Sequence, residues 1–282
     1  MEHMEQQLGS LLPEDMEFNL SDFALFLSVM KNQEAHRCIL SIIMGEPDLE
    51  LVGIHAEEVV LNRSGKRAIR LDAAAVDTKK RRYSTEMQND TSQDDIRKRS
   101  RYYQSLLDTP LLKSGRETRY RHLPPSVVTF ITQEDIFGKD LSKYTFREQC
   151  EEVPGLHLED GTMKLFLNMT SKNGDPVLVS LLQYMKQSRI DNPEIQVKDE
   201  RIVTLDAVVR EVKQSEEWEA VKMSILSIGI EKGERQFLQN TTLKKLKKGM
   251  DIPQIAKDLE TDESVIREII AGLESGKGSE EL

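Results

Sequence analysis

Hydrophobic and polar residues alternate with a period of two through residues 69–88, in two runs joined by a polar, basic turn. This alternation predicts two half-buried strands that form a hairpin. If three residues after Asp77 form the loop, Asp77 pairs with Arg81, and the two partner numbers add up to 158 along the whole hairpin. This register places Asp72 opposite Glu86 on one sheet face. A slip of one residue would send the two acids to opposite faces, so the prediction depends on the loop length.

The opposed carboxylates of Asp72 and Glu86 suggest a bound cation. Two like charges on one sheet face repel each other unless a positive charge lies between them. Mg²⁺ prefers oxygen ligands and usually takes one or two protein carboxylates together with substrate phosphate. Gln88 points the same way as Glu86 and offers a neutral amide to the same site. The alternative is a surface hairpin with a solvated polar face, because short motifs often occur by chance.

Helical and extended patterns flank the hairpin in a definite order. Apolar residues at three- and four-residue spacing predict helices, and a continuous apolar run predicts a strand that is buried on both faces. The expected elements around the hairpin are one or two helices within 20–44, a strand within 49–61, a helix at 96–107 that begins after Asp94 or Asp95, and a buried strand at 126–132.

The hairpin and several later stretches resemble one protein family. The run LDAAAVD–x5–YSTEMQ is similar to the Asp…Glu-x-Gln motif of the PD-(D/E)XK nuclease family transposases, also called Rpn-type recombination-promoting nucleases. The stretches SRYYQSLLDTPLLKSG, YTFREQCEEVPGLHLEDG and KLFLN resemble the same family in the same order, so the resemblance spans residues 19–184. It implies an α/β fold with a restriction-endonuclease-like α-β-β-β-α-β core, a mixed sheet, extra strands and a helical C-terminal region.

The resemblance also implies an activity, which is Mg²⁺-dependent hydrolysis of DNA by an endonuclease. Asp72 and Glu86 would hold the metal, Gln88 would complete the catalytic set, and Asp22 matches the family's acid ahead of the first helix. Asp22 is equally typical of a plain helix start. The superfamily often has lysine where Gln88 stands, and a neutral amide stabilises developing charge less well. The alternative is a catalytically inactive nucleic-acid-binding or assembly protein on the same fold.

Positive charge is concentrated around the predicted acidic site. Residues 63–121 include 16 Lys and Arg against eight Asp and Glu, whereas the whole chain has a net charge of −10. This distribution is typical of a phosphate-binding surface, although a charged run is as often a solvated face. DNA is the expected partner, and an RNA substrate is also compatible with the residues. The predicted DNA contacts are Arg70, Lys79, Arg81, Arg97 and Arg101.

Composition favours a soluble, cytoplasmic protein without a membrane partner. No run approaches the roughly 18 apolar residues that a membrane helix needs, and the acidic N-terminus lacks a secretory pattern. The two cysteines are too few for a disulfide framework and are expected to be reduced. We expect a lead-in at 1–18, a nuclease-like domain at 19–190 and a helical region at 191–282.

The expected helical region begins with a long amphipathic pattern that Gly229 and Gly233 interrupt. It ends in a helix–turn–helix pair within 251–270. The second helix of this pair is acidic, which is unfavourable for entering a DNA groove. The pair is therefore better interpreted as a packing or self-association module, through which the chain could form a homo-oligomer.

Overall fold

The computed structural model describes residues 17–60, 69–92, 94–112 and 119–276. The chain divides into two compact units, one that spans Glu17–Trp218 and one whose described part begins at Glu219. The first unit is an α/β fold with a mixed sheet, as predicted. It extends beyond the predicted domain boundary at residue 190, because helix α6 (Glu200–Lys213) packs against α3 (Gln33–Met44). Most of the predicted lead-in lies outside the described residues.

Six strands form one sheet within the described residues, in the order β1-β2-β3-β4-β6-β5. The β1–β2, β2–β3 and β5–β6 pairs are antiparallel, and the β3–β4 and β4–β6 pairs are parallel. The strands are β1 (Leu51–Val60), β2 (Ile69–Asp77), β3 (Arg82–Gln88), β4 (Ser126–Thr132), β5 (Lys143–Phe146) and β6 (Thr162–Asn168).

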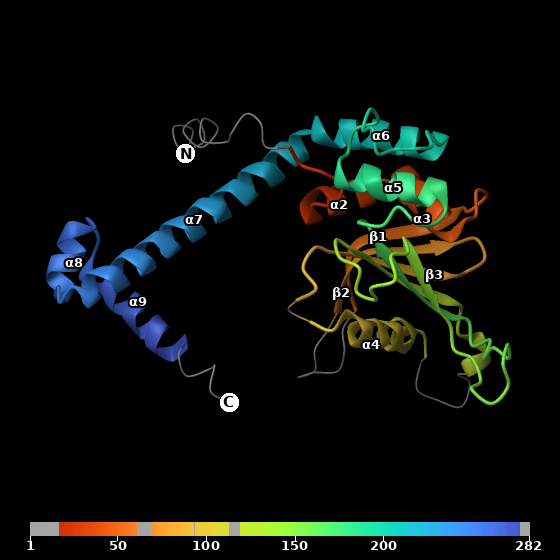
Figure 1. Ribbon diagram of the computed structural model, residues 1–282, viewed down its shortest axis with the longest axis horizontal. Helices are drawn as coiled ribbons and strands as arrows, with labels where there is room; N and C mark the ends of the chain where they lie inside the picture. Colours follow the sequence, from red (N-terminus) through yellow and green to blue (C-terminus); the bar gives the residue numbers. More distant parts are fainter. Residues whose placement is uncertain (1–16, 61–68, 93, 113–118, 277–282) are drawn as a thin grey trace. The chain divides into compact units, whose positions relative to one another are not determined.

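Helices cover both faces of this sheet (Figure 1). Helices α2 (Phe23–Met30), α3, α5 (Pro176–Lys186) and α6 lie on one side, and α4 (Ile96–Asp108) lies on the other. Every residue of β4, in the middle of the sheet, is buried, as its apolar sequence predicts. Two short 3₁₀ turns, Thr109–Leu111 and Tyr120–His122, follow α4. The element order in the first part of the unit is therefore two helices, three strands, a helix and a strand.

The helical pattern predicted within 20–44 forms two helices, α2 and α3. Asn32 is the N-cap of α3, where its side chain accepts hydrogen bonds from the backbone N–H groups of Glu34 and Ala35. Gly45 ends α3 in the left-handed conformation, with a φ of 67°. A residue with a Cβ would be strained there, so a glycine is the natural stop signal.

The hairpin has the predicted register. Ala73 pairs with Thr85 and Ala75 pairs with Tyr83. At the turn, the N–H of Asp77 donates to the carbonyl of Arg81 at 3.1 Å. The loop is therefore three residues long, and the numbers of paired residues add up to 158 as expected. The sequence pattern alone was enough here because one face of each strand is buried, which fixes the register.

The second unit contains α7 (Glu216–Lys247) from Glu219 onward, α8 (Ile252–Asp258) and α9 (Glu263–Gly276). The predicted interruption at Gly229 and Gly233 is wrong, since α7 runs through both glycines and the break from α6 precedes it. A glycine costs a helix interior only about 1 kcal/mol, so it does not have to end a helix. The predicted α8–α9 pair is confirmed, with Ile255 and Ile266 in its buried seam. Self-association through this pair stays a prediction.

Each helix in the described part of the chain is too short or too polar to cross a lipid bilayer.

Candidate metal and nucleic-acid site

The fold brings Asp72 of β2 and Glu86 of β3 together. The backbone N–H of Asp72 donates to Glu86 Oε1 at 3.2 Å, and the N–H of Met87 donates to Asp72 Oδ2 at 3.1 Å. The two acids thus link neighbouring strands at the end of the regular ladder. Both are buried, since Asp72 is 7 % exposed and Glu86 is fully covered.

Glu86 carries an incompletely compensated buried carboxylate. Its Oε1 also accepts a hydrogen bond from the Ser84 hydroxyl at 3.0 Å, whereas its Oε2 has no hydrogen-bond partner among the residues that the structure describes. The guanidinium of Arg99 is 3.5 Å from Oε2, within ion-pair distance. Burial, with a further contribution from the charge of Asp72, raises the pKa of Glu86 to about 8. A cation placed here would relieve this cost.

Arg99 is the residue of this site that the sequence analysis missed. Helix α4 begins after Asp95, whose side chain caps it, and presents Arg99 to the ends of β3 and β4. Arg99 donates to the side-chain carbonyl of Gln88 at 2.8 Å and to the Tyr103 hydroxyl at 2.6 and 3.0 Å. Its guanidinium also lies 5.6 Å from the ring centre of Phe130. The i, i+4 spacing of Arg99 and Tyr103 is the signal that could have identified it.

Gln88 lies beside the acid pair but contacts Arg99. Its amide oxygen accepts from Arg99, and its amide nitrogen donates to the carbonyl of Asp90. The side chain therefore orients the guanidinium. Its described hydrogen bonds do not include Asp72 or Glu86.

Asp22 does not join the acid pair in a three-residue cluster. Its carboxylate accepts a hydrogen bond from the N–H of Asn19 at 2.6 Å, at the N-cap position of α2. Ser21 next to it is tied to the end of β3, because Asn89 donates to its carbonyl at 2.9 Å. Within the described part of the chain, no group of three or more Asp, Glu, His or Cys side chains is arranged to hold a metal ion. A metal at Asp72 and Glu86 would therefore have two protein carboxylates.

The predicted DNA contacts separate into two groups. Arg81 is held by Asp77 and by both carboxylate oxygens of Glu46, at 2.6 Å for each contact, and only 18 % of its side chain is exposed. The exposed Lys79 lies in the turn of the same hairpin, 3.4 Å from Glu46. The turn is five residues along β2 from Asp72, or roughly 17 Å. Arg81 is thus engaged in ion pairs within the fold, and its contact with DNA stays a prediction.

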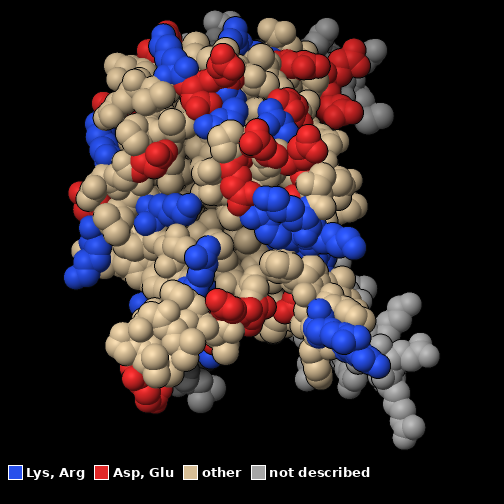
Figure 2. Space-filling model, turned by 90° about the vertical axis from the view of Figure 1, so that its right-hand side faces the viewer, with Lys and Arg blue, Asp and Glu red and all other residues tan. Residues whose placement is uncertain are grey.

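Arg97 and Arg101 fit the predicted role better. Both are exposed on α4, the helix that also carries Arg99. Arg97 forms an exposed ion pair with Asp95 at 3.1 Å, which costs little to break. Arg70 is in β2, but its side chain lies outside the described residues. On the face of the molecule drawn in Figure 2, Lys and Arg are interspersed with Asp and Glu and do not form an unbroken basic surface.

Comparison of the chain with protein-family models, curated proteins and solved structures finds no match. The motifs quoted above therefore carry the family resemblance by themselves.

Proposed function

We propose that the protein is a Mg²⁺-dependent DNA endonuclease of the recombination-promoting type, with Asp72 and Glu86 as the metal ligands. The observation that carries the proposal is the buried pair itself: Glu86 accepts a hydrogen bond from the backbone N–H of Asp72, and its Oε2 is buried without a hydrogen bond from the described residues. Uncompensated buried carboxylates cost stability, and a perturbed acid pair of this kind is more typical of a functional site than of a plain core.

The arrangement of the elements supports this proposal. Helices, a three-stranded antiparallel segment, a helix and a parallel strand follow in the order α2–α3–β1–β2–β3–α4–β4. This is the order expected for a restriction-endonuclease-like core, in which the acids lie on the central hairpin. Fold-level likeness does not by itself define an activity, so the site residues must carry the argument.

The donor set fits Mg²⁺ in type and charge. This ion prefers oxygen, often uses only two protein carboxylates and keeps several waters, so the pair does not need a third acid. When bound, Mg²⁺ would polarise the scissile phosphate and lower the pKa of a bound water. Asp72 and Glu86 would have to be ionised to hold it. Because Arg99 covers Glu86, its side chain would move aside on binding.

Arg99 supplies the positive charge that Gln88 lacks. The guanidinium lies beside Glu86 and is oriented by Gln88 and Tyr103. Once it moves from Glu86 toward the phosphate, it would stabilise the negative charge that develops on the phosphoryl oxygens during attack. Arg97 and Arg101 would contact the flanking phosphates, which do not react.

A second candidate function is a nucleic-acid-binding protein without catalysis. The full burial of Glu86 favours it, because the carboxylate has no exposed surface through which a metal or phosphate could reach it in this conformation. The two functions predict different effects of divalent metal and of an Asp72 substitution on DNA cleavage.

Nicking of supercoiled plasmid tests the proposal. The wild type should nick the plasmid with Mg²⁺ and not with EDTA, and Asp72→Asn should abolish nicking while retaining DNA affinity. Glu194→Gln is a matched control, because Glu194 is an exposed acid in an ion pair with Lys172. This variant should nick the plasmid as the wild type does. Absence of nicking in the wild type with all divalent metals tested would favour the binding protein.

A further inference from the structure

A groove of about 400 Å³ lies on the α4 side of the sheet. Three aromatic rings form one part of its lining, and basic side chains from three separate elements form another. The lining residues that matter here are Arg97, Arg101, Phe137, Phe146, Arg147, Lys164 and Phe166. These residues are distinct from the acid pair, although Arg99 of the same helix reaches that pair.

The aromatic part of the groove is built around an exposed ring. Phe146 is 43 % exposed, whereas Phe166 is 3 % exposed and belongs to the core. The ring of Phe146 lies 5.0 Å from that of Phe137 and 5.7 Å from that of Phe166, measured between centroids. These neighbours hold Phe146 in place, so the exposed ring is a firm surface on which a planar group can stack.

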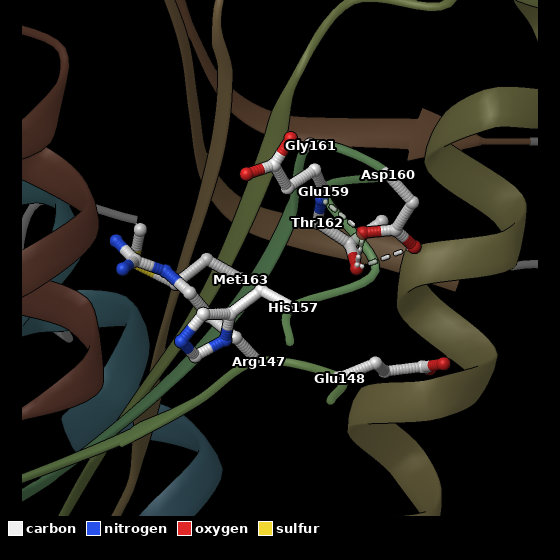
Figure 3. A pocket seen from close by; sticks show the side chains of 8 residues that line it. All are labelled: Arg147, Glu148, His157, Glu159, Asp160, Gly161, Thr162 and Met163. Carbon is white, nitrogen blue, oxygen red and sulfur yellow. Dashed lines mark hydrogen bonds between the residues drawn. The ribbon is translucent and has the colours of Figure 1, made fainter. Parts of the chain in front are cut away.

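Positive charge surrounds this ring. Lys164 pairs with Phe146 in the β5–β6 ladder, so the two side chains leave the same sheet face about 5 Å apart at Cβ. Arg97 and Arg101 are one helical turn apart on α4 and line the groove from the other side. Arg147 also lines the groove, but its guanidinium points away from α4 and lies beside the sulfur of Met163 (Figure 3). Glu148 is the one carboxylate among the described lining residues. A planar group with an attached anion fits this combination.

An acidic hollow adjoins the groove (Figure 3). This second hollow, of about 340 Å³, shares Arg147, Glu148 and Thr162 with the groove. The rest of its lining adds Glu159 and Asp160, so acids outnumber bases there. Asp160 accepts hydrogen bonds from Thr162, as Figure 3 shows. A phosphate would be repelled by these carboxylates at this end of the groove.

We propose that the groove binds an unstacked nucleotide, with its base against Phe146 and its phosphate among Arg97, Arg101 and Lys164. Base stacking on an aromatic ring combined with basic contacts to the backbone is how proteins hold single strands. The nucleotide could belong to a single strand or be free, since both present the same chemistry. The inference rests on the proposed function, because the bound strand would be part of the nuclease substrate, but binding can be measured without cleavage.

Fluorescence anisotropy of a labelled oligothymidylate in EDTA tests the proposal. Phe146→Leu should weaken binding about tenfold by removing the stacking ring. Arg101→Gln should weaken binding and reduce the slope of log K against log salt concentration by about 0.7, the value for one phosphate contact on a single strand. Phe23→Leu is a matched control, because Phe23 is 39 % exposed on α2, across the sheet. It should bind as the wild type does.

Competition identifies the source of the nucleotide. Displacement by unlabelled oligothymidylate but not by thymidine monophosphate assigns the groove to a strand, and equal displacement by the monophosphate assigns it to a free nucleotide. Equal binding by Phe146→Leu and Phe23→Leu would overturn the proposal, as would equal displacement by polyglutamate. Binding is measured in EDTA and does not depend on cleavage, so failure of the nuclease proposal and failure of this proposal give different results.

Discussion

Replacement of Glu86 by glutamine gives the most direct physical test of the acid pair. Burial and the charge of Asp72 raise the pKa of Glu86 from 4.5 to about 8, so the folded protein binds a proton more tightly than the unfolded chain does. Stability is therefore unaffected below pH 4.5 and falls as the pH rises from 4.5 towards 8. The loss is about 1.4 kcal/mol per pH unit, or roughly 3 kcal/mol at pH 7.

Glutamine cannot ionise, so Glu86→Gln should remove this loss. Its carbonyl oxygen can still accept the hydrogen bonds from the Asp72 N–H and the Ser84 hydroxyl. The variant should match the wild type near pH 4.5 and be more stable by roughly 3 kcal/mol at pH 7 without divalent metal. Mg²⁺ should stabilise the wild type and have much less effect on the variant, because a ligand stabilises only the state that binds it.

Urea unfolding followed by tryptophan fluorescence measures this difference. Trp218 is the only tryptophan, is 2 % exposed and packs edge-on against Phe18 at 5.2 Å, so its emission reports on the unit that contains the site. Glu194→Gln serves as the control for the loss of one surface charge. If the wild type and Glu86→Gln lose stability in parallel between pH 4.5 and pH 7, Glu86 is not an uncompensated carboxylate and the reasoning is refuted.

Two further variants test the structural interpretation of charged groups. Arg81→Met should lower the free energy of unfolding by about 3 kcal/mol, because it leaves the buried Asp77 without its cation. The variant should bind DNA as tightly as the wild type. A loss of DNA affinity without a loss of stability would instead identify Arg81 as a DNA contact. Burial lowers the pKa of His36 to about 4, so wild-type stability should fall as the pH drops from 6.5 towards 4. His36→Leu should lose roughly 2 kcal/mol less than the wild type between pH 7 and pH 5 in urea unfolding, and equal losses would contradict the assignment.

Local signals were sufficient to predict the hairpin and several helix ends. Period-two alternation and a three-residue turn determined which face each residue of β2 and β3 occupies, and thus placed Asp72 opposite Glu86. Asp95 and Gly45 act within a few residues of their own position, so the start of α4 and the end of α3 could be predicted from the sequence. The pattern of hydrophobic residues predicts these elements because side chains alternate between the two faces of a strand and recur every three or four residues on one face of a helix.

Only the tertiary structure decided which charged groups meet. Arg81 is held by Glu46 across 35 residues of sequence, and no local pattern distinguishes it from the exposed Arg101 on a basic stretch. Likewise, the groove collects Phe146 and Lys164 from strands that pair only after folding. Arg101 of α4, which lines the same groove, precedes Phe146 by 45 residues. Side chains distant in sequence become partners through packing, and their burial sets which charges are compensated. The sequence therefore determined the acid pair, whereas the fold determined Arg99 as its cation.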